Sequence, residues 1–162
     1  MSATLQLAAD LGAALGGRGW IAATAESCTG GLIAGAITDI SGSSGWFDRG
    51  FVTYSNDAKI ELLGVRAETL KRFGAVSEET AREMVGGALE RSHADIAVAV
   101  TGVAGPTGGT AAKPVGLVWL AWGTRSGGVD AVSYRFPGDR AAIREATVAM
   151  ALAGLLERAG PG

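Results

Sequence analysis

Short strand-like segments alternate with helical ones along most of the chain, and this alternation is the strongest constraint on its fold. Residues 95–101, DIAVAVT, are short, apolar and rich in β-branched side chains, which is typical of a buried strand. Residues 20–25 and 51–54 are predicted as further strands. Because helical segments separate these strands, the sequence predicts an α/β fold, a mixed and mostly parallel sheet with helices on both faces in three α/β/α layers.

Capping residues and glycines mark where the helices begin and end. Gly16 and Gly17 are expected to close the first helix, and Gly64 a later one. The loop SGSSGWFDRG at 41–50 is predicted to be irregular because of its serines and glycines. Helices are predicted at 3–15, at about 30–37, after a cap at Ser55 or Asn56, at 67–72, and from a cap at Ser77 to about 91.

The C-terminal part is predicted to form a β-hairpin followed by a long helix. Residues 115–122 and 129–136 flank the turn sequence GTRSGG, which favours antiparallel pairing. The last helix, at about 139–158, is apolar nearly all round and should be buried on two sides. Either the core or a subunit interface can cover this helix. We expect one domain over 1–162, and we expect it to assemble as a homodimer because a small domain has limited room to cover such a helix.

Composition restricts the classes of partner. With 48% hydrophobic and 19% charged residues, the chain suits a globular domain with a real core. Fourteen basic residues against 16 acidic ones give a net charge of -2, so we expect no nucleic-acid partner. A single cysteine excludes an internal disulfide and fits the cytoplasm. The N-terminus is a poor signal peptide, and no apolar run approaches the roughly 18 residues of a membrane span, so no membrane partner is expected.

The sequence TAESCTGGLIAG at 24–35 places hydroxyls and a thiol directly before two glycines. In one interpretation Ser27 or Thr29 caps the following helix. In the other, the amides of Gly30 and Gly31 receive an oxyanion that forms when a hydroxyl attacks a carbonyl. Local sequence leaves both interpretations open.

Cys28 is a second candidate nucleophile, because a thiol at a helix N-terminus can have a lowered pKa. Its partner base is missing, since the only histidine, His93, lies in the polar turn ERSHAD. A buried, inert Cys28 is therefore favoured.

The sequence VTYSNDAK brings Tyr54 and Ser55 close to Lys59. A lysine acts as a base only where burial or positive neighbours lower its pKa. Two hydroxyls compete as its partner, the local Ser55 and the distant Ser27. The alternative is that Ser55 caps the helix and Lys59 is solvated.

The sequence TGVAGPTGG follows a buried strand and begins at Thr101, as nucleotide-phosphate loops at strand ends often do. It is not a Walker A loop, because Lys113 comes too late, and a structural turn is the alternative. Arg140 and Arg144, one turn apart in the last helix, are either phosphate ligands or solvated. No histidine pair, CxxC or dense carboxylate motif is present, so no metal site is expected.

Three stretches together carry a family resemblance: TAESCTGGLIAG; GFVTYSNDAKIELLGV with GAVSEETAREM; and AVTGVAGPTGGTAAKPVG. They resemble the stand-alone form of the CinA C-terminal domain family of nicotinamide mononucleotide amidohydrolases, over about residues 3–158. The resemblance implies hydrolysis of the substrate carboxamide to nicotinate mononucleotide and ammonia in pyridine nucleotide salvage. It does not extend to the larger N-terminal domain of full-length CinA proteins. Arg49 stands where many relatives have a glycine, which bears on loop detail alone.

Carried onto this sequence, the resemblance implies that Ser27, Tyr54 and Lys59 are catalytic. The implied substrate-binding residues are Glu26, Thr29, Gly30, Gly31, Thr101, Gly102, Ala104, Gly105 and Arg140. In the resulting hypothesis Ser27 attacks the carboxamide carbon, and a neutral Lys59 takes its proton directly or through Tyr54. Water resolves the acyl-enzyme without a metal or organic cofactor.

Roles for the binding residues follow from the same hypothesis. The Gly30 and Gly31 amides receive the oxyanion, and Arg140 holds the phosphate. Glu26 is assigned to the pyridinium ring. A module of the same fold that binds a pyridine nucleotide, or a competence or repair partner, without turnover is the alternative.

Overall fold

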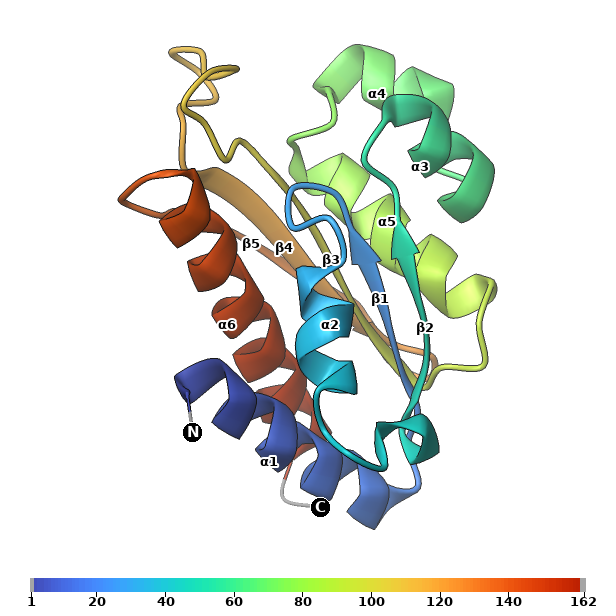
Figure 1. The fold of residues 1–162 in the computed structure, drawn as a ribbon. Coiled ribbons are helices and arrows are strands. Elements are labelled where there is room, and N and C mark those ends of the chain that lie inside the picture. Colours follow the sequence, from blue (N-terminus) through green and yellow to red (C-terminus); the bar gives the residue numbers. More distant parts are fainter. Residues whose placement is uncertain (1, 161–162) are drawn as a thin grey trace.

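The computed structural model describes residues 2–160, whose strands form one five-stranded sheet in the order β2-β1-β3-β4-β5. The strands are β1 (Ala22–Glu26), β2 (Phe47–Val52), β3 (Ile96–Gly102), β4 (Leu117–Thr124) and β5 (Val129–Arg135). β1 pairs in parallel with both β2 and β3, whereas β4 is antiparallel to β3 and to β5. All strands except β4 therefore run in one direction, which confirms the predicted mixed sheet with its hairpin (Figure 1).

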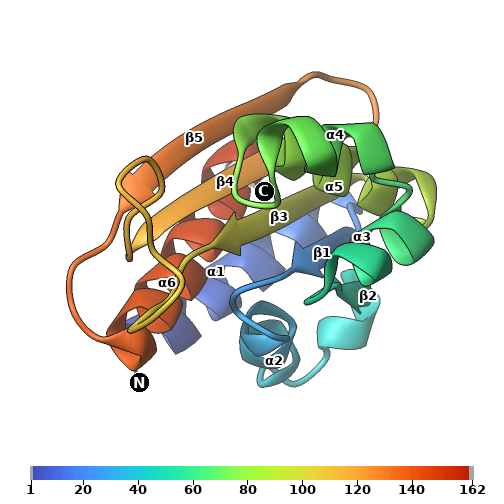
Figure 2. The ribbon, with the colours of Figure 1, turned by 90° about the horizontal axis from the view of Figure 1, so that it is seen from above.

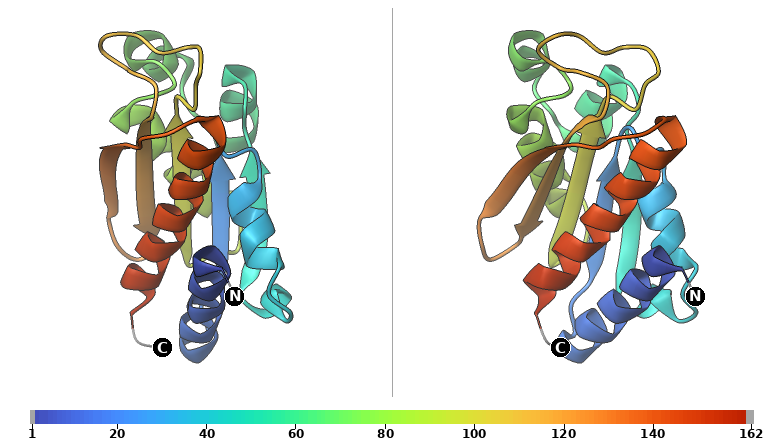
Figure 3. Two further views of the ribbon diagram at one scale, coloured as in Figure 1. Left: turned by 60° about the vertical axis from the view of Figure 1, so that its left-hand side comes forward. Right: turned by 90° about the vertical axis from the view of Figure 1, so that its left-hand side faces the viewer.

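Helices cover both faces of the sheet, as predicted. They are α1 (Ala3–Arg18), α2 (Leu32–Thr38), α3 (Asn56–Leu63), α4 (Ala67–Phe73), α5 (Glu78–Glu90) and α6 (Arg140–Ala159), with a 3-10 turn η1 (Ser43–Gly45). Helices α1, α2 and α6 lie on one face, and α5 lies on the other with α3 and α4 beside it (Figures 1 and 3). Predicted caps at Ser55 and Ser77 are confirmed, because each hydroxyl accepts from the amide three residues later.

Alternation along the central strand β3 separates two hydrophobic cores. Ile96, Val98 and Val100 are fully buried against α1, α2 and α6, where large side chains fill the layer. Ala97 and Ala99 face α5 instead. These small side chains let α5 lie close to the sheet, so both faces of β3 are buried from solvent.

The carboxyl ends of β1, β2 and β3 meet at one edge of the sheet, because these strands are parallel. The segments that follow them gather at this edge together with α3 and α4 (Figure 2). In open α/β sheets this is the edge where ligands bind. The three sequence clusters therefore come from separate parts of the chain to one place.

The prediction for β2 was wrong at both ends. The strand begins at Phe47 and ends at Val52, so the second part of the predicted loop 41–50 is strand and Tyr54 lies beyond it. Pairing with β1 imposes this extended backbone despite the turn-like composition. Gly50 fits there because a Cβ atom would lie 2.7 Å from Thr24 Oγ1.

The first helix is longer than predicted. It runs through Gly16 and Gly17 to Arg18 and ends where Gly19 adopts a left-handed conformation with φ 68°. Glycine is tolerated inside a helix at a modest cost, whereas the left-handed C-cap position favours it. A glycine therefore ends the helix, as predicted, but it is Gly19 rather than Gly16 or Gly17.

Helix α6 is buried on two sides within the chain itself. Its apolar face packs against the sheet and against α1, and Gly154 lies so close to the Trp122 ring that a Cβ atom would clash at 2.1 Å. The helix thus gives no support to a homodimer, which stays a prediction. Among the described helices none combines the length and the apolar character that crossing a membrane requires.

Candidate active site

A cavity of about 270 Å³ opens at the carboxyl edge of the sheet. All three sequence clusters contribute to it, together with the start of α6. It is lined by Ser27, Cys28, Tyr54, Asn56, Lys59, Ala75, Val76, Thr101, Gly102, Ala104 and Arg140. The structure thus brings together seven of the predicted site residues: Ser27, Tyr54, Lys59, Thr101, Gly102, Ala104 and Arg140.

Ser27 and Lys59 are in direct contact at the bottom of this cavity. Lys59 projects from α3, and its Nζ atom lies 2.9 Å from Ser27 Oγ, which directly follows β1. The Lys59 amine also donates to the backbone carbonyls of Thr53, at 2.9 Å, and Tyr54, at 3.4 Å. Ser55 binds the amide of Ala58 instead, so the structure decides the competition for Lys59 in favour of Ser27.

Lys59 has surroundings that favour its neutral form. Only 1% of the residue is exposed, and no described carboxylate forms an ion pair with it. Burial lowers the pKa of the Lys59 amine from its ordinary value. The interpretation of Lys59 as a solvated surface lysine was therefore wrong.

Cys28 lines the cavity but is not activated. Burial raises the pKa of its thiol to about 12, and the negative charge of Glu26 adds to this effect. At neutral pH the thiol is therefore protonated, and its nucleophilicity is low. The structure supports the inert Cys28 that the sequence favoured.

Tyr54 and Arg140 form the polar mouth of the cavity. The Arg140 guanidinium donates to the Gly105 carbonyl at 2.9 Å and to the Tyr54 hydroxyl at 3.3 Å. The Tyr54 side chain is 63% exposed, and Lys59 contacts its backbone carbonyl alone. A proton relay through the Tyr54 hydroxyl is thus not supported, while the direct route from Ser27 to Lys59 is.

Thr101 lines the cavity at the end of β3. It is almost fully buried, and its hydroxyl donates to the Ala75 carbonyl at 2.9 Å. This contact holds the segment between α4 and α5 against the sheet. The hydroxyl oxygen can still accept a hydrogen bond from a ligand, because its proton is already directed to Ala75.

Glu26 does not reach the cavity. Its side chain is fully buried and accepts from the Thr29 hydroxyl at 2.5 Å and from the amides of Gly31, Ile33 and Ala34 at 3.2, 2.9 and 3.0 Å. A carboxylate from the preceding strand thus satisfies the N-terminal amides of α2, and neither Ser27 nor Thr29 caps it. Glu26 therefore caps α2 and does not line the cavity, and the electrostatic effect on a pyridinium ring stays a prediction.

The predicted oxyanion donors are also engaged elsewhere. The Gly31 amide binds Glu26, and the Gly30 amide donates to the Ser27 carbonyl at 3.1 Å. Both glycines have positive φ, 56° and 104°, so their part is to turn the chain sharply between β1 and α2. Thr29, Gly30, Gly31 and Gly105 support the wall of the cavity without lining it.

Sequence reasoning missed three lining residues. Asn56 belongs to the YSN part of the lysine motif, and its side chain was weighed there only as a helix cap. Ala75 and Val76 stand in GAVSEETAREM, and as aliphatic residues they carry no reactive group that would mark a site. Their position became evident only because Thr101 holds that segment at the cavity.

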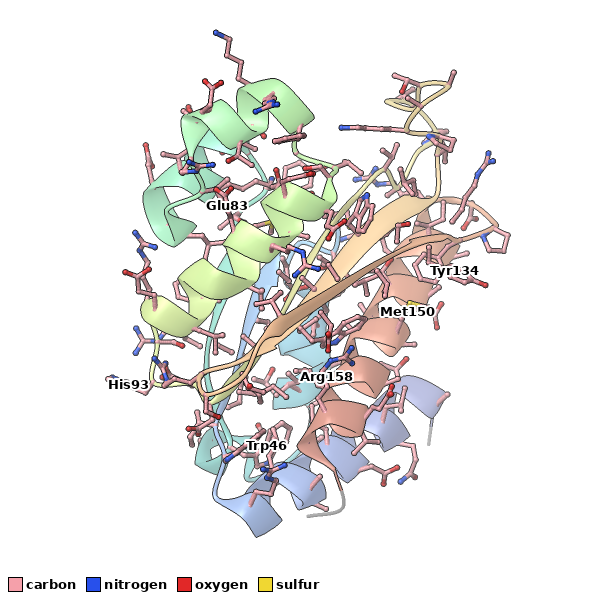
Figure 4. All side chains as sticks on the ribbon, turned by 180° about the vertical axis from the view of Figure 1, so that it is seen from behind. Trp46, Glu83, His93, Tyr134, Met150 and Arg158 are labelled. Atoms are coloured by element: carbon pink, nitrogen blue, oxygen red, sulfur yellow. The ribbon has the colours of Figure 1, made fainter. Side chains whose placement is uncertain are left out.

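Other reactive side chains lie away from the cavity. His93 is exposed just beyond the end of α5, away from α4 and the carboxyl edge of the sheet (Figure 4). Over residues 2–160, no three His, Cys, Asp or Glu side chains gather as metal ligands would. The reactive groups that line the cavity include the Ser27 hydroxyl, the Lys59 amine and the Arg140 guanidinium.

Comparison with known proteins identifies the family of the chain. The model of the CinA C-terminal domain matches residues 4–159. The chain belongs to this family. A nicotinamide-nucleotide amidohydrolase PncC from Enterobacter agglomerans is 58% identical over 139 residues, covering 86% of this chain and 85% of its own. The protein of the same name from Escherichia coli strain K12 is 53% identical over 153 residues, covering 93% and 92%.

Solved structures of the family have the same fold. The competence/damage inducible protein CihA from Agrobacterium tumefaciens has a TM-score of 0.95 and 54% identity, covering 97% of this chain and 96% of its own. A CinA superfamily protein from Klebsiella pneumoniae has a TM-score of 0.92 and 44% identity, covering 96% and 97%. The fold of this chain is therefore that of CinA-superfamily proteins along almost its whole length.

Proposed function

We propose that this CinA-family domain is a nicotinamide-nucleotide amidohydrolase, which converts nicotinamide mononucleotide into nicotinate mononucleotide and ammonia. The observation that carries the proposal is the 2.9 Å contact between Ser27 Oγ and the buried Lys59 amine inside a cavity. A sensor of pyridine nucleotides needs no such pair. The names of relatives that are 53–58% identical over most of their length supply the substrate.

Activation of Ser27 follows from the contacts of Lys59. A neutral amine has two N–H bonds and one lone pair. The two N–H groups donate hydrogen bonds to the carbonyls of Thr53 and Tyr54. The lone pair is then free to accept the proton of the Ser27 hydroxyl, which lies 2.9 Å away. Lys59 is therefore built as a general base rather than as an ion-pair partner.

The reaction proceeds through an acyl-enzyme. Ser27 Oγ attacks the carboxamide carbon as its proton moves to Lys59, and the carbonyl oxygen gains the negative charge. When the tetrahedral intermediate collapses, the C–N bond breaks and Lys59 returns the proton to the leaving ammonia. Water then attacks the ester carbon as the neutral Lys59 takes its proton. The bond between this carbon and Ser27 Oγ breaks, Lys59 returns the proton to Ser27 Oγ, and the acid product leaves as its carboxylate after losing a proton to solvent. The reaction needs only these side chains, backbone amides and water.

Positioning of the mononucleotide is assigned to the mouth of the cavity. Arg140 keeps donors beyond those used by Gly105 and Tyr54, and a guanidinium suits a phosphate monoester. Thr101 Oγ1 can accept a hydrogen bond from the carboxamide NH2 group. A single free cysteine fits the reducing cytoplasm, where we place the reaction as a step of pyridine nucleotide salvage.

The test is ammonia release from nicotinamide mononucleotide by the purified metal-free protein and by Ser27→Ala. We expect turnover in the parent and a loss of at least about 1,000-fold in Ser27→Ala, because nucleophile and base act as a unit. Calorimetry should still detect nucleotide binding by Ser27→Ala. A parent that binds the nucleotide without turnover would instead establish the sensor module.

A further inference from the structure

Arg144 lies behind the turn that carries the nucleophile. From the first part of α6 its Nε atom donates to the Cys28 carbonyl at 3.1 Å, and Nη2 donates to the Thr29 carbonyl at 3.3 Å. Arg144 does not line the catalytic cavity. It lines a separate, open cavity of about 450 Å³ between α1, α2 and α6. We therefore assign Arg144 no direct contact with the substrate.

The two contacts fix the orientation of successive peptide planes. In a trans peptide the N–H bond points away from the C=O bond of the same plane. The Cys28 carbonyl points to Arg144, so the Thr29 amide faces away from Arg144. The Thr29 carbonyl also points to Arg144, so the Gly30 amide faces away and donates to the Ser27 carbonyl.

That last hydrogen bond fixes the remaining plane of the turn. With its carbonyl held by the Gly30 amide, the Ser27–Cys28 peptide directs the Cys28 amide to the opposite side. Within residues 2–160 neither the Cys28 amide nor the Thr29 amide donates a hydrogen bond to another residue, and the Cys28 amide contacts only its own thiol. They are the amides of the turn without a partner in another residue, and the first belongs to a residue that lines the cavity.

We propose that Arg144 is a positioning residue for the oxyanion of the amidase reaction, holding the Cys28 and Thr29 amides toward the charge that develops beside Ser27. This inference rests on the proposed function. In other serine hydrolases the amide after the nucleophile has the same task. Preorganised amide donors stabilise the transition state more than the bound substrate. Loss of their orientation should therefore lower kcat and leave KM nearly unchanged.

The decisive experiment compares the kinetics of Arg144→Ala with those of the wild type, using nicotinamide mononucleotide and ammonia release. Loss of one oxyanion donor costs about 100- to 1,000-fold in kcat, so looser donors should cost about 10- to 100-fold. KM should stay within about twofold, because no substrate contact is lost. Methylguanidinium at millimolar concentration should restore part of kcat, since the open cavity between α1, α2 and α6 gives it access to the empty position.

Arg125→Ala is the matched control. Arg125 likewise braces backbone carbonyls, those of Ala94, Leu89 and Ser92, but at the other end of the sheet. The Arg125→Ala variant should have a lower melting temperature and an unchanged kcat, and methylguanidinium should not alter its kcat. If both variants lose activity in step with stability, Arg144 is merely structural and the proposal is wrong.

Arg144→Lys guards against a variant that does not fold. A lysine keeps the charge but cannot hold two carbonyls as a guanidinium does. It should keep a melting temperature near that of the wild type and still lose kcat several-fold. Wild-type kcat in Arg144→Lys, or an increase in KM alone, would overturn the proposal. Absence of turnover in the wild type would refute the proposed function itself, and with it this inference.

Discussion

Replacing Glu26 by glutamine tests the main difference between the sequence interpretation and the structure. The Oε1 atom accepts from the Thr29 hydroxyl, the Gly31 amide and the Ile33 amide, while Oε2 accepts from the Ala34 amide alone. The glutamine should keep its oxygen at the first position and place its NH2 group against Ala34. Two donors then face each other, and the Ala34 amide loses its acceptor.

The size of the effect follows from this single loss. A hydrogen bond to a charged group contributes about 1.5–3 kcal/mol, and an unsatisfied donor adds its own penalty, so Glu26→Gln should lose about 3 kcal/mol of stability. For a chain of this length that lowers the melting temperature by about 6–12 °C. The assay is thermal unfolding followed by circular dichroism, together with kcat and KM for nicotinamide mononucleotide. We expect kcat to fall, because the turn that carries Ser27 loosens, and KM to change little.

Glu83→Gln is the control for this prediction. Glu83 also uses both oxygens, accepting from the Arg66 amide at 2.9 Å and the Thr69 hydroxyl at 2.6 Å, but its side chain is 27% exposed and distant from the cavity. Water can replace the lost contact, so it should cost about 1 kcal/mol or less and leave kcat unchanged. An unchanged melting temperature for Glu26→Gln, combined with a raised KM, would refute the capping role. It would favour instead an electrostatic interaction between Glu26 and the pyridinium ring of the substrate.

The remaining predictions concern the base, the thiol and the helix packing. Lys59→Met should lower kcat by at least about 100-fold. In the wild type kcat should rise with pH to a plateau below the ordinary lysine value of 10.5, because burial lowers the pKa of Lys59 and only the neutral amine is a base; a flat pH profile would contradict this. Cys28→Ala should keep kcat within about threefold, and iodoacetamide should label Cys28 slowly at pH 7, because its pKa is raised to about 12. Gly87→Ala should lower the free energy of unfolding in urea by at least about 2 kcal/mol, since its Cβ atom would lie 1.9 Å from the Leu63 carbonyl oxygen.

Local sequence proposed Ser27, Lys59, Thr101 and Arg140 as candidates, because each stands at a strand end or near a helix start, but it left an alternative role open for each. The three motifs of the family resemblance selected among these alternatives, and the structure brings all four side chains to one cavity. The fold class was predictable from local sequence, because the periodicity of the apolar residues is a local property. The start of β2 was not, because Phe47 is extended only through its pairing with Ala22.

The same distinction explains why the capping role of Glu26 was not predicted. Glu26 carries the charge that a cationic ring attracts, and its sequence position next to Ser27 suggested that function. The partners that decide its role are the amides of residues five to eight positions later, and these are available only because α2 begins at Leu32. Whether an amide is free to bind an oxyanion is likewise a property of the folded turn.

The turn that carries Ser27 has no regular structure of its own, so its shape depends on buried side chains from neighbouring elements. The Glu26 carboxylate accepts the N–H groups that follow the turn, and the Arg144 guanidinium donates to the C=O groups inside it. Each backbone group thus selects the charge that it can bind: an anion for the N–H groups and a cation for the C=O groups. Between these two contacts the Cys28 and Thr29 amides are the ones that donate to no other residue of the described chain. These two amides directly follow the nucleophile Ser27. They stay available because Glu26 and Arg144 bind the neighbouring N–H and C=O groups of the turn.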